Sequence, residues 1–367
     1  MIFWFCAFVT VIWLGLAFFW HGFWRVDQRL PLAPEPLASY PSVTAIIPAR
    51  NEQETIATSV GQLHGQEYNG DFSIIVANDS STDKTREVLL GLQSETANLA
   101  IVDTEPLPSG WVGKMWALHS GIKQAETAKP DYYWLSDADI AHQPGVLNSL
   151  VAHAEMGNLA LVSQMVALRC TTFWEKLLVP AFIFYFTLIY PFRAINNPDS
   201  AIAGAAGGSI LIRRDALERI GGIETLKGAI IDDCTLAKLI KQSGGKIWLG
   251  FGERSRSLRG YDQLSDFWQM VQRSAYTQLK FSPILLFIAV AGIAVSHVLP
   301  VTILCLPALI VMAAIYWPTV RFYGLSPLWV LTLPIAAVLF GAMTISSALA
   351  YHLGWSNQWR NREIGGS

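Results

Sequence analysis

The segment Tyr132-Tyr133-Trp134-Leu135-Ser136-Asp137-Ala138-Asp139 decides the fold and the expected chemistry of this 367-residue chain. Its first five residues are mainly aromatic and apolar, which predicts a short buried strand. Asp137 and Asp139 follow at the end of that strand, and two carboxylates at this spacing suit a hard divalent cation. A turn or a helix cap is the alternative, because Asp also accepts hydrogen bonds from nearby backbone amides.

Strand and helix patterns alternate on the N-terminal side of this segment. We expect strands at 43–47, 72–77, 99–102 and 132–136, and helices at 52–64, 82–92 and 114–126. Repeated strand–helix units predict an α/β fold with a mostly parallel, Rossmann-like sheet that helices cover on both faces. Ligands bind beyond the carboxyl ends of the strands in such sheets. Polar clusters follow three of these ends, at 49–52, 78–81 and 137–139.

Several ligand classes are disfavoured. No G-x-G-x-x-G follows the first strand and no G-x-x-x-x-G-K-[ST] occurs, so a dinucleotide oxidoreductase and a P-loop NTPase both lack their main signature. A net charge of −2 without a basic run argues against nucleic acid as a partner. Gly113-Lys114 opens a predicted helix, and a helix N-terminus favours phosphate, although an ordinary loop-to-helix start has the same pattern.

Apolar residues are concentrated at the two ends of the chain, which is 52% hydrophobic and 15% charged. Residues 2–24 contain no Asp, Glu, Lys or Arg, and a helix of this length can cross a hydrocarbon core of about 30 Å. We expect a retained membrane anchor, with a cleaved signal peptide as the alternative. Residues 283–318 and 328–353 are also uncharged. They predict about three further spans, the first two forming a tight pair that turns near His297 to Pro300, with a tilted or re-entrant arrangement as the alternative.

Basic residues at the ends of these spans predict the orientation. Arg25 and Arg29 follow the first span, and Lys280 precedes the C-terminal ones, so the positive-inside rule places the middle of the chain in the cytoplasm. We therefore expect a multi-pass protein of the inner (plasma) membrane. Arg360 and Arg362 fall on the outer side by this count, which argues against it.

The four cysteines are scattered, and no C-x-x-C pair occurs. This spacing predicts neither a disulfide framework nor a zinc site, and reduced thiols fit a cytoplasmic domain.

Four motifs occur in order: Ile46-Ile47-Pro48-Ala49-Arg50-Asn51-Glu52, Asn78-Asp79-Ser80-Ser81-Thr82-Asp83, Gly113-Lys114 and Asp137-Ala138-Asp139. Together they resemble glycosyltransferase family 2 with its GT-A fold, over about residues 41–280. The stretches 110–117 and 273–279 further resemble the membrane-bound hopene-associated members. The domains implied are a transmembrane anchor (1–24), a Pro-rich linker (25–41), a GT-A domain (42–280), a C-terminal transmembrane region (281–355) and a tail (356–367).

The resemblance implies roles on the donor side. A nucleotide-sugar pocket, with a UDP-sugar as the expected donor, would be lined by Ala49, Arg50, Glu52, Asp79, Lys114 and Asp137. Asp79 would contact the uracil or the ribose, and Lys114 would approach the nucleotide or its phosphates. Asp137 would face the ribose side, while Asp139 would face the diphosphate and, with Asp137, a divalent cation, Mg²⁺ or Mn²⁺.

The resemblance also implies roles on the acceptor side. The glycine-rich segment 204–214 resembles the family's acceptor segment, so Gly207 and Gly208 would contact the acceptor. Asp232 and Asp233 stand where the family has an acidic pair, with Asp233 in the base position. Asp232 replaces the more usual Glu, which leaves the base open between these neighbours. A carboxylate base is needed because an alcohol is a poor nucleophile near neutral pH.

The expected activity is inverting transfer of a sugar to a lipid hydroxyl, with a hopanoid-type lipid as one candidate. The apolar segment 173–192, whose aromatic residues are placed like interfacial ones, suits an acceptor at the bilayer surface, and a buried core helix is the alternative. Gln269 to Arg273 imperfectly resembles the Q-x-x-R-W of processive members, so Arg273 has a possible diphosphate role. A processive polysaccharide synthase and a non-catalytic membrane scaffold remain the alternatives.

Overall fold

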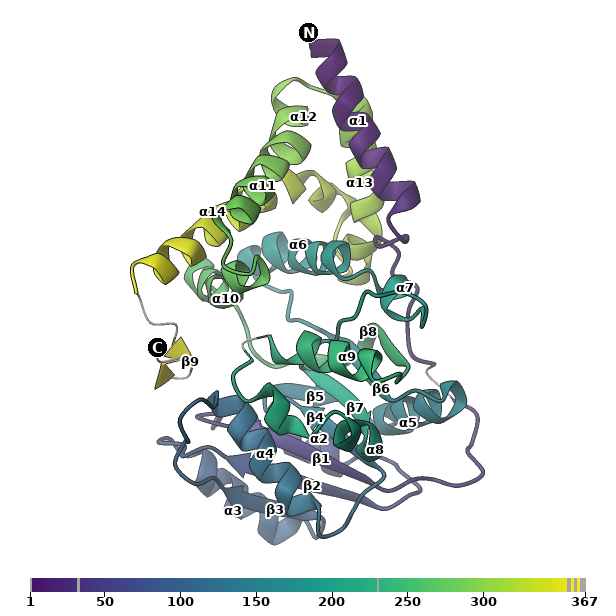
Figure 1. The fold of residues 1–367 in the computed structure, drawn as a ribbon, viewed down its shortest axis with the longest axis vertical. Coiled ribbons are helices and arrows are strands. Elements are labelled where there is room, and N and C mark those ends of the chain that lie inside the picture. Colours follow the sequence, from purple (N-terminus) through teal and green to yellow (C-terminus); the bar gives the residue numbers. More distant parts are fainter. Residues whose placement is uncertain (1, 32–33, 230, 355–357, 360–361, 364–367) are drawn as a thin grey trace. The chain divides into compact units, whose positions relative to one another are not determined.

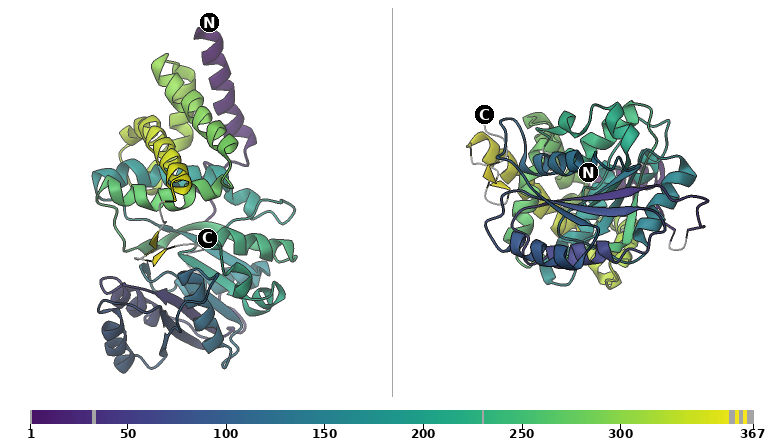
Figure 2. Two further views of the ribbon diagram at one scale, coloured as in Figure 1. Left: turned by 60° about the vertical axis from the view of Figure 1, so that its left-hand side comes forward. Right: turned by 90° about the horizontal axis from the view of Figure 1, so that it is seen from below.

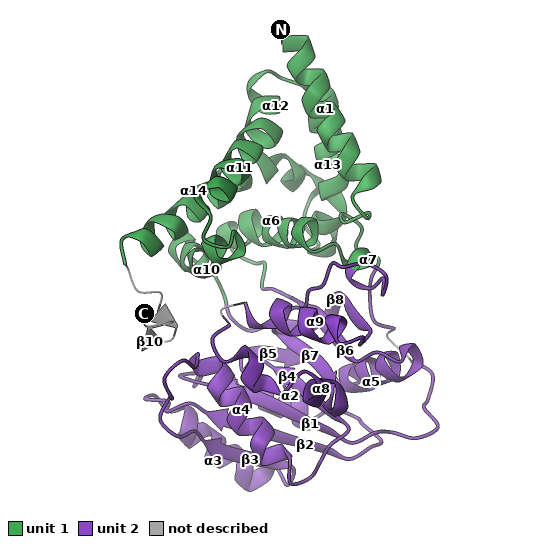
Figure 3. Ribbon diagram, viewed as in Figure 1, with its two compact units in different colours: residues 1–27, 169–194, 260–357 green, residues 28–168, 195–259, 358–367 purple. Residues whose placement is uncertain are grey.

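The computed structural model describes residues 2–31, 34–229, 231–354, 358–359 and 362–363. The chain forms two compact units, each assembled from separate stretches of sequence (Figure 3). The helical unit contains residues 1–27, 169–194 and 260–357, and the sheet unit contains residues 28–168, 195–259 and 358–367. Residues 169–194 belong to the helical unit although the stretches before and after them belong to the sheet unit, and this was not expected from the sequence. Most of the predicted tail, 356–367, lies outside the described residues.

The sheet unit is built on an eight-stranded sheet (Figure 1). In chain order the strands are β1 (Val43–Ala49), β2 (Phe72–Asn78), β3 (Leu99–Asp103), β4 (Tyr132–Ser136), β5 (Ile140–His142), β6 (Leu161–Ala167), β7 (Ser209–Arg213) and β8 (Ile247–Ser257). Their order in the sheet is β3-β2-β1-β4-β7-β6-β8-β5. The first four strands pair in parallel, as predicted. The sheet as a whole is mixed, because β7 is antiparallel to both β4 and β6, and β5 is antiparallel to β8.

Helices lie on both faces of this sheet. They are α2 (Ile56–His64), α3 (Thr85–Glu95), α4 (Gly113–Ala125), α5 (Val146–Gly157), α8 (Arg214–Arg219), the 3-10 turn η1 (Ile223–Leu226) and α9 (Asp232–Gln242). A further short helix, α7 (Phe192–Ile195), falls at the sequence boundary between the units. The alternating strand–helix order confirms the predicted α/β class.

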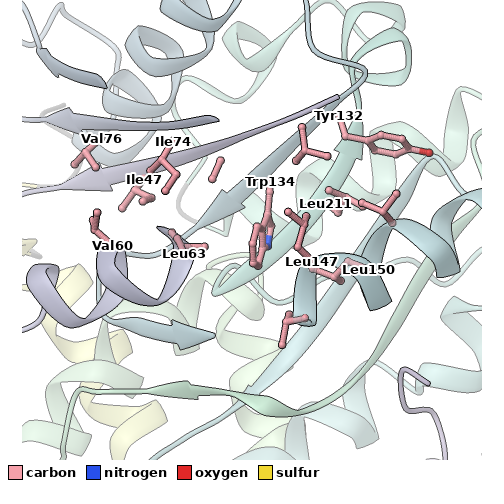
Figure 4. Packing of buried hydrophobic residues seen from close by; sticks show 14 of the residues in the cluster. Ile47, Val60, Leu63, Ile74, Val76, Tyr132, Trp134, Leu147, Leu150 and Leu211 are labelled. Carbon is pink, nitrogen blue, oxygen red and sulfur yellow. The ribbon is translucent and has the colours of Figure 1, made fainter. Parts of the chain in front are cut away.

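Alternate residues of the central strands face different helices. Ile47 of β1 and Val76 of β2 pack in one buried cluster with Val60 and Leu63 of α2 (Figure 4). On the other face, α4 approaches β1 so closely that a Cβ on Gly121 would lie 2.6 Å from Cγ2 of Ile46. Burial on both faces explains why these strands are apolar throughout rather than alternating.

Two helices begin three or four residues later than predicted, because their first residues form the loops of the site instead. The backbone N–H of Glu52 donates to the Thr85 hydroxyl over 2.7 Å. Asp83 accepts from the Thr85 backbone N–H over 2.9 Å at the start of α3. The loops after β1 and β2 are therefore joined by side chains that sequence analysis had assigned to helices.

The helical unit contains α1 (Ile2–Phe19), α6 (Phe173–Ile189), α10 (Leu264–Gln278), α11 (Pro283–Ile293), a π-helical turn (Ala294–Val298), α12 (Leu299–Thr302), α13 (Leu306–Phe322), the 3-10 turn η3 (Pro327–Thr332) and α14 (Leu333–His352). Among the described residues, four helical stretches are long and apolar enough to cross a membrane: 2–19, 173–195, 283–302 and 327–352. Helix α13 is apolar but shorter. Figures 1 and 2 show α6 and α10 near one end of the helices α1, α11 and α13, and hydrogen bonds join α10 to the second half of α14.

The predicted turn near His297 to Pro300 is wrong. The chain stays helical through this stretch by way of the π-helical turn, and it reverses only at residues 303–305. His297 is buried, and its ring contacts the hydroxyl of Tyr185 over 3.0 Å and that of Ser296 over 2.7 Å. These polar partners let His297 remain buried inside the helical unit, where the sequence predicted a turn between two spans.

The prediction that no disulfide forms is also wrong. Cys6 of α1 is bonded to Cys305, which directly precedes α13, across a separation of 299 residues. Cys170 and Cys234 are free thiols. The rule applied to the sequence relies on cysteines that are close together in the chain, and it cannot detect two helices that bring distant cysteines into contact.

Helix α6 supports the buried alternative for the segment 173–192. Its first turn has a capping box in which Thr172 and Glu175 exchange hydrogen bonds, and Glu175 is fully buried. Six of the next nine residues are buried hydrophobics, and Tyr185 is bonded to His297. Most of this helix therefore forms part of the core of the helical unit.

Candidate active site

The site lies at the carboxyl ends of the parallel strands, where the sequence placed it. β1 and β2 pair so that Ala49 is opposite Asn78, and β4 runs beside β1 and ends at Ser136. The loops after these three strands therefore start from one edge of the sheet. Asp137 and Asp139 follow β4 on this edge.

Lys114 is at the centre of one cluster. Its Nζ lies 2.9 Å from Oδ1 of Asp137 and 3.5 Å from Oδ2 of Asp232. Burial alone would lower the pKa of Lys114, but the carboxylates of Asp137, Asp232 and Asp233 raise it well above its usual value. Lys114 thus carries a positive charge at the start of α4, where the helix dipole is also positive.

Asp233 belongs to the same cluster and is held by two backbone amides. Its Oδ2 accepts from the N–H of Gly207 over 2.8 Å, and its Oδ1 accepts from the N–H of Cys234 over 2.7 Å. Burial and the neighbouring Asp232 raise the pKa of Asp233 to about 6, against the opposing effect of Lys114. A carboxylate with this pKa is deprotonated near neutral pH and is still basic enough to take a proton.

A small pocket adjoins this cluster within the sheet unit. Its polar lining is Lys114, Ser136, Asp137, Asp232 and Asp233, and its remaining lining is Pro48, Met115, Leu118, Leu135, Gly207, Ile210, Ile223, Leu226 and Leu236. Residues predicted to bind the donor, to bind the acceptor and to act as the base therefore border one pocket. They are Lys114, Asp137, Gly207, Asp232 and Asp233. Gly208 points elsewhere, since a Cβ there would lie 3.1 Å from Cγ2 of Val166.

A second cluster joins Glu52 and Asp139 through Arg259, which sequence analysis missed. The Nε of Arg259 lies 2.8 Å from Oδ2 of Asp139, and its NH2 lies 3.3 Å from Oε1 of Glu52. Arg259 follows β8, outside the four motifs that carried the family resemblance. The only available signal was a basic residue just beyond the end of a strand.

Arg50 and Asp79 form an internal contact. Asp79 is fully buried, and NH1 of Arg50 donates to its carbonyl over 2.6 Å and lies 3.9 Å from its carboxylate. Thr104 donates to the Asp79 carboxylate over 3.3 Å. These contacts join the loops after β1 and β2, and the nucleotide-binding role of Ala49, Arg50 and Asp79 stays a prediction.

A buried polar chain supports the Asp137 corner, and it too was missed. Ser136, directly before Asp137, contacts Nε2 of His142 over 2.9 Å, and Nδ1 of His142 contacts Ser255 over 2.9 Å. Ser255 in turn donates to Gln164 over 2.8 Å. Burial lowers the pKa of His142 to about 3, so the ring is neutral. It connects Ser136 to Ser255 by hydrogen bonds.

Arg273 belongs to α10 of the helical unit. Its neighbour Gln272 donates to the hydroxyl of Ser346 over 2.9 Å, which joins α10 to α14. The imperfect Q-x-x-R-W stretch thus contributes to helix packing, and a diphosphate role for Arg273 stays a prediction.

The donor set fits a cation that arrives with a phosphate ligand. Within the described residues no group of three or more His, Cys, Asp or Glu could hold a metal ion. Mg²⁺ is typically held by one or two protein carboxylates, with substrate phosphates and water completing its shell. Asp137 and Asp139 supply this number of carboxylates.

The sheet order and the carboxylates beyond β4 define the GT-A class of fold. A solved structure of this class, described as mannosyltransferase PcManGT from Pyrobaculum calidifontis in complex with GDP-Man and Mn²⁺, superposes with a TM-score of 0.58 and 18% identity. The match covers 97% of this chain and 100% of that one, and at this identity it shows the fold.

The sequence comparison gives the family. Residues 44–221 match the family described as Glycosyl transferase family 2, so the chain contains a family 2 glycosyltransferase domain. The probable glycosyltransferase YdaM of Bacillus subtilis (strain 168) is 26% identical over 232 residues, covering 58% of this chain and 52% of that protein. The beta-monoglucosyldiacylglycerol synthase of Nostoc sp. (strain PCC 7120) is 23% identical over 282 residues, covering 71% and 58%. The chain thus spans only part of the length of these relatives.

Proposed function

We propose that the protein is a membrane-bound, inverting glycosyltransferase that transfers a sugar from a nucleoside diphosphate sugar to a lipid hydroxyl. The observation that carries this proposal is the convergence of Lys114, Asp137 and Asp233 on one pocket. Such a displacement requires a cation beside the phosphates, a carboxylate that can hold a metal ion, and a carboxylate base. Lys114, Asp137 and Asp233 would supply these three groups in that order.

Asp233 is the proposed base. The acceptor hydroxyl attacks C1 of the sugar, and a carboxylate within hydrogen-bond reach takes the proton as the new bond forms. The raised pKa of Asp233 and its two backbone contacts suit this role, whereas Asp232 pairs with Lys114. Single displacement inverts the configuration at C1 and requires no covalent sugar–enzyme intermediate.

The leaving diphosphate develops negative charge, which fixed cations stabilise. Lys114 supplies one such charge beside Asp137. A divalent cation held by Asp137 and Asp139 would act as a Lewis acid on the diphosphate. The neighbour in complex with GDP-Man and Mn²⁺ supports a nucleotide-sugar donor and such a cation, while UDP as the nucleotide is our more specific proposal from the family resemblance.

A lipid acceptor is supported by three relatives named beta-monoglucosyldiacylglycerol synthase, since monoglucosyldiacylglycerol is a glycerolipid. It is also supported by the four helical stretches of membrane-spanning length in the described chain. A hopanoid alcohol is the finer proposal that follows from the family resemblance. Processive polymer synthesis is less well supported, because Gln272 of the imperfect Q-x-x-R-W stretch is bonded to Ser346.

Two features of the helical unit support a cytoplasmic catalytic domain. Arg25 and Lys280 flank one end of α1 and α11, and Arg321 lies in the last turn of α13. The disulfide between Cys6 and Cys305 joins α1 and α13 near their N-terminal ends, which are the ends away from Arg25 and Arg321. Disulfides persist in oxidising compartments, so this end would face away from the cytoplasm.

Purified protein in nanodiscs, with nucleotide sugars and lipid extract, provides the test. We expect cation-dependent transfer that chelator and Asp139→Asn abolish while the protein stays folded, and mass spectrometry of the product would identify the lipid. Full activity in chelator would contradict the metal assignment. If the protein neither hydrolyses the donor nor transfers the sugar, the alternative of a non-catalytic membrane scaffold would be favoured.

Orientation is tested separately with a reporter inserted in residues 94–98. We expect this reporter to be protected in intact cells. Its modification by an impermeant reagent would refute the cytoplasmic placement.

A further inference from the structure

Arg259 connects two acidic side chains that come from different strand ends. Its guanidinium contacts Asp139 through Nε and Glu52 through NH2, at 2.8 Å and 3.3 Å. The side chains of Asp139 and Glu52 are only 14% and 10% exposed, whereas that of Arg259 is 33% exposed. The bridge therefore joins a comparatively accessible cation to two nearly buried anions.

Electrostatics explains why Arg259 lies between Asp139 and Glu52. Two carboxylates that are largely removed from water repel each other and lose hydration, so a positive charge shared between them offsets both costs. The planar fork of Arg can serve two carboxylates at once, which a Lys ammonium does less well. In the nucleotide-free protein Arg259 thus provides the positive charge that Asp139 needs.

The backbone keeps Asp139 in place independently of this ion pair. The N–H of Leu258 donates to the carbonyl of Asp139 over 2.7 Å, which joins the backbone just before Arg259 to the backbone of Asp139. This main-chain bond does not depend on the ion pair between the two side chains.

We infer that Arg259 is a positioning residue that competes with a divalent cation for Asp139 in the nucleotide-free protein and turns to the donor's diphosphate when the nucleotide binds. The inference rests on the proposed function, because it takes a nucleoside diphosphate as the ligand. Arg259 would keep Asp139 correctly placed and weakly accessible to free metal, so that the cation binds well only together with the diphosphate.

Metal binding without nucleotide tests this competition directly. Mn²⁺ alone is titrated into the full-length protein in detergent, and free Mn²⁺ is followed by electron paramagnetic resonance. We expect Arg259→Gln to bind Mn²⁺ about ten-fold more tightly than the wild type, the equivalent of about 1.4 kcal/mol. The double variant Arg259→Gln with Asp139→Asn should lose this gain, and Arg259→Lys should fall between Arg259→Gln and the wild type.

A second measurement, of UDP affinity in the presence of Mn²⁺, should move in the opposite direction, because Arg259→Gln removes a diphosphate ligand. Arg256→Gln is the matched control, since Arg256 is exposed on β8, three residues before Arg259, and its substitution should change neither affinity. Melting temperatures confirm that each variant is folded, and the charge-conserving Arg259→Lys serves if the Gln variant fails to fold.

Unchanged or weaker Mn²⁺ binding in folded Arg259→Gln would overturn the inference. So would UDP affinity that rises or stays the same. Either result, obtained beside normal sugar transfer by the wild type, would leave the proposed function standing. Loss of transfer in the wild type would overturn the proposed function instead.

Discussion

The backbone N–H of Gly207 donates a hydrogen bond to Oδ2 of Asp233 over 2.8 Å. The glycine-rich segment before β7 and the acidic pair at the start of α9 are separated by 26 residues, and this bond brings them together. The second carboxylate oxygen accepts from Cys234. The proposed base is therefore oriented by main-chain groups, which most side-chain substitutions nearby would leave in place.

Asp233→Asn should lower the rate of sugar transfer by about two to four orders of magnitude, the usual contribution of general-base catalysis. Donor affinity should change little, because the base acts on the acceptor. Transfer rate and donor affinity by calorimetry are measured together, with Asp232→Asn as the matched variant. The assignment fails if Asp233→Asn loses donor affinity in proportion to rate, or if Asp232→Asn alone is inactive.

The pH dependence of transfer should report Asp233. Its pKa of about 6 lies above the usual value for Asp, so kcat/KM should rise with pH up to about 6 and then level off. Asp232→Asn removes a charge that raises this pKa, so the rising limb should move to lower pH. An unshifted limb in that variant would show that another group controls the profile.

The same pKa has the opposite effect on stability. A carboxyl whose pKa is raised on folding stabilises the folded state when it is protonated, and this contribution is lost as pH rises through about 6. The free energy of unfolding of the wild type should therefore fall, relative to Asp233→Asn, between about pH 4 and pH 6. Parallel denaturant titrations of the two proteins at several pH values measure the difference, and equal slopes would contradict it.

Sequence patterns predicted the first four strands of the sheet, β1 to β4, and the edge at which the site forms, whereas β5 to β8 were not predicted. This succeeded because local hydrophobicity determines a buried strand, and the carboxyl ends of parallel strands share one edge. Asp137 follows the end of β4 directly, and Lys114 opens α4 after β3. Asp233 lies in the first turn of α9 and follows no strand end, so its place was expected from the family resemblance alone.

The missed features all depend on contacts between distant parts of the chain. Arg259 is marked by no local pattern, and only the pairing of β5 with β8 brings its segment to Asp139. The bond between Cys6 and Cys305 likewise requires α1 and α13 to pack together. His297 was assigned to a turn because the uncharged stretch 283–318 is long for one membrane-spanning helix and short for two, whereas its contact with Tyr185 satisfies the ring inside the helical unit.

Gly207→Ala should disturb the site without unfolding the protein. An added Cβ would lie 3.2 Å from Nζ of Lys114 and 3.4 Å from Oδ2 of Asp233, so both charged groups would have to shift slightly. We expect transfer to fall by about ten- to hundred-fold, because small misplacements of reacting groups are costly. Gly91→Ala, in helix α3 with nothing within 4 Å of the new Cβ, is the control and should retain full activity. Equal losses in both variants would indicate a general folding effect.

The disulfide between Cys6 and Cys305 should stabilise the helical unit. Its two cysteines are 299 residues apart in the sequence, and loss of a disulfide costs about 2–4 kcal/mol in typical proteins. Cys6→Ser and Cys305→Ser should each lower the melting temperature in detergent, and the double variant should be no worse than either single one, because both remove the same bond. Cys170→Ser changes a free thiol and serves as the control. Reductant should lower the wild-type melting temperature to that of the variants, and a wild type that reacts fully with maleimide before reduction would show that the bond is not formed in the membrane.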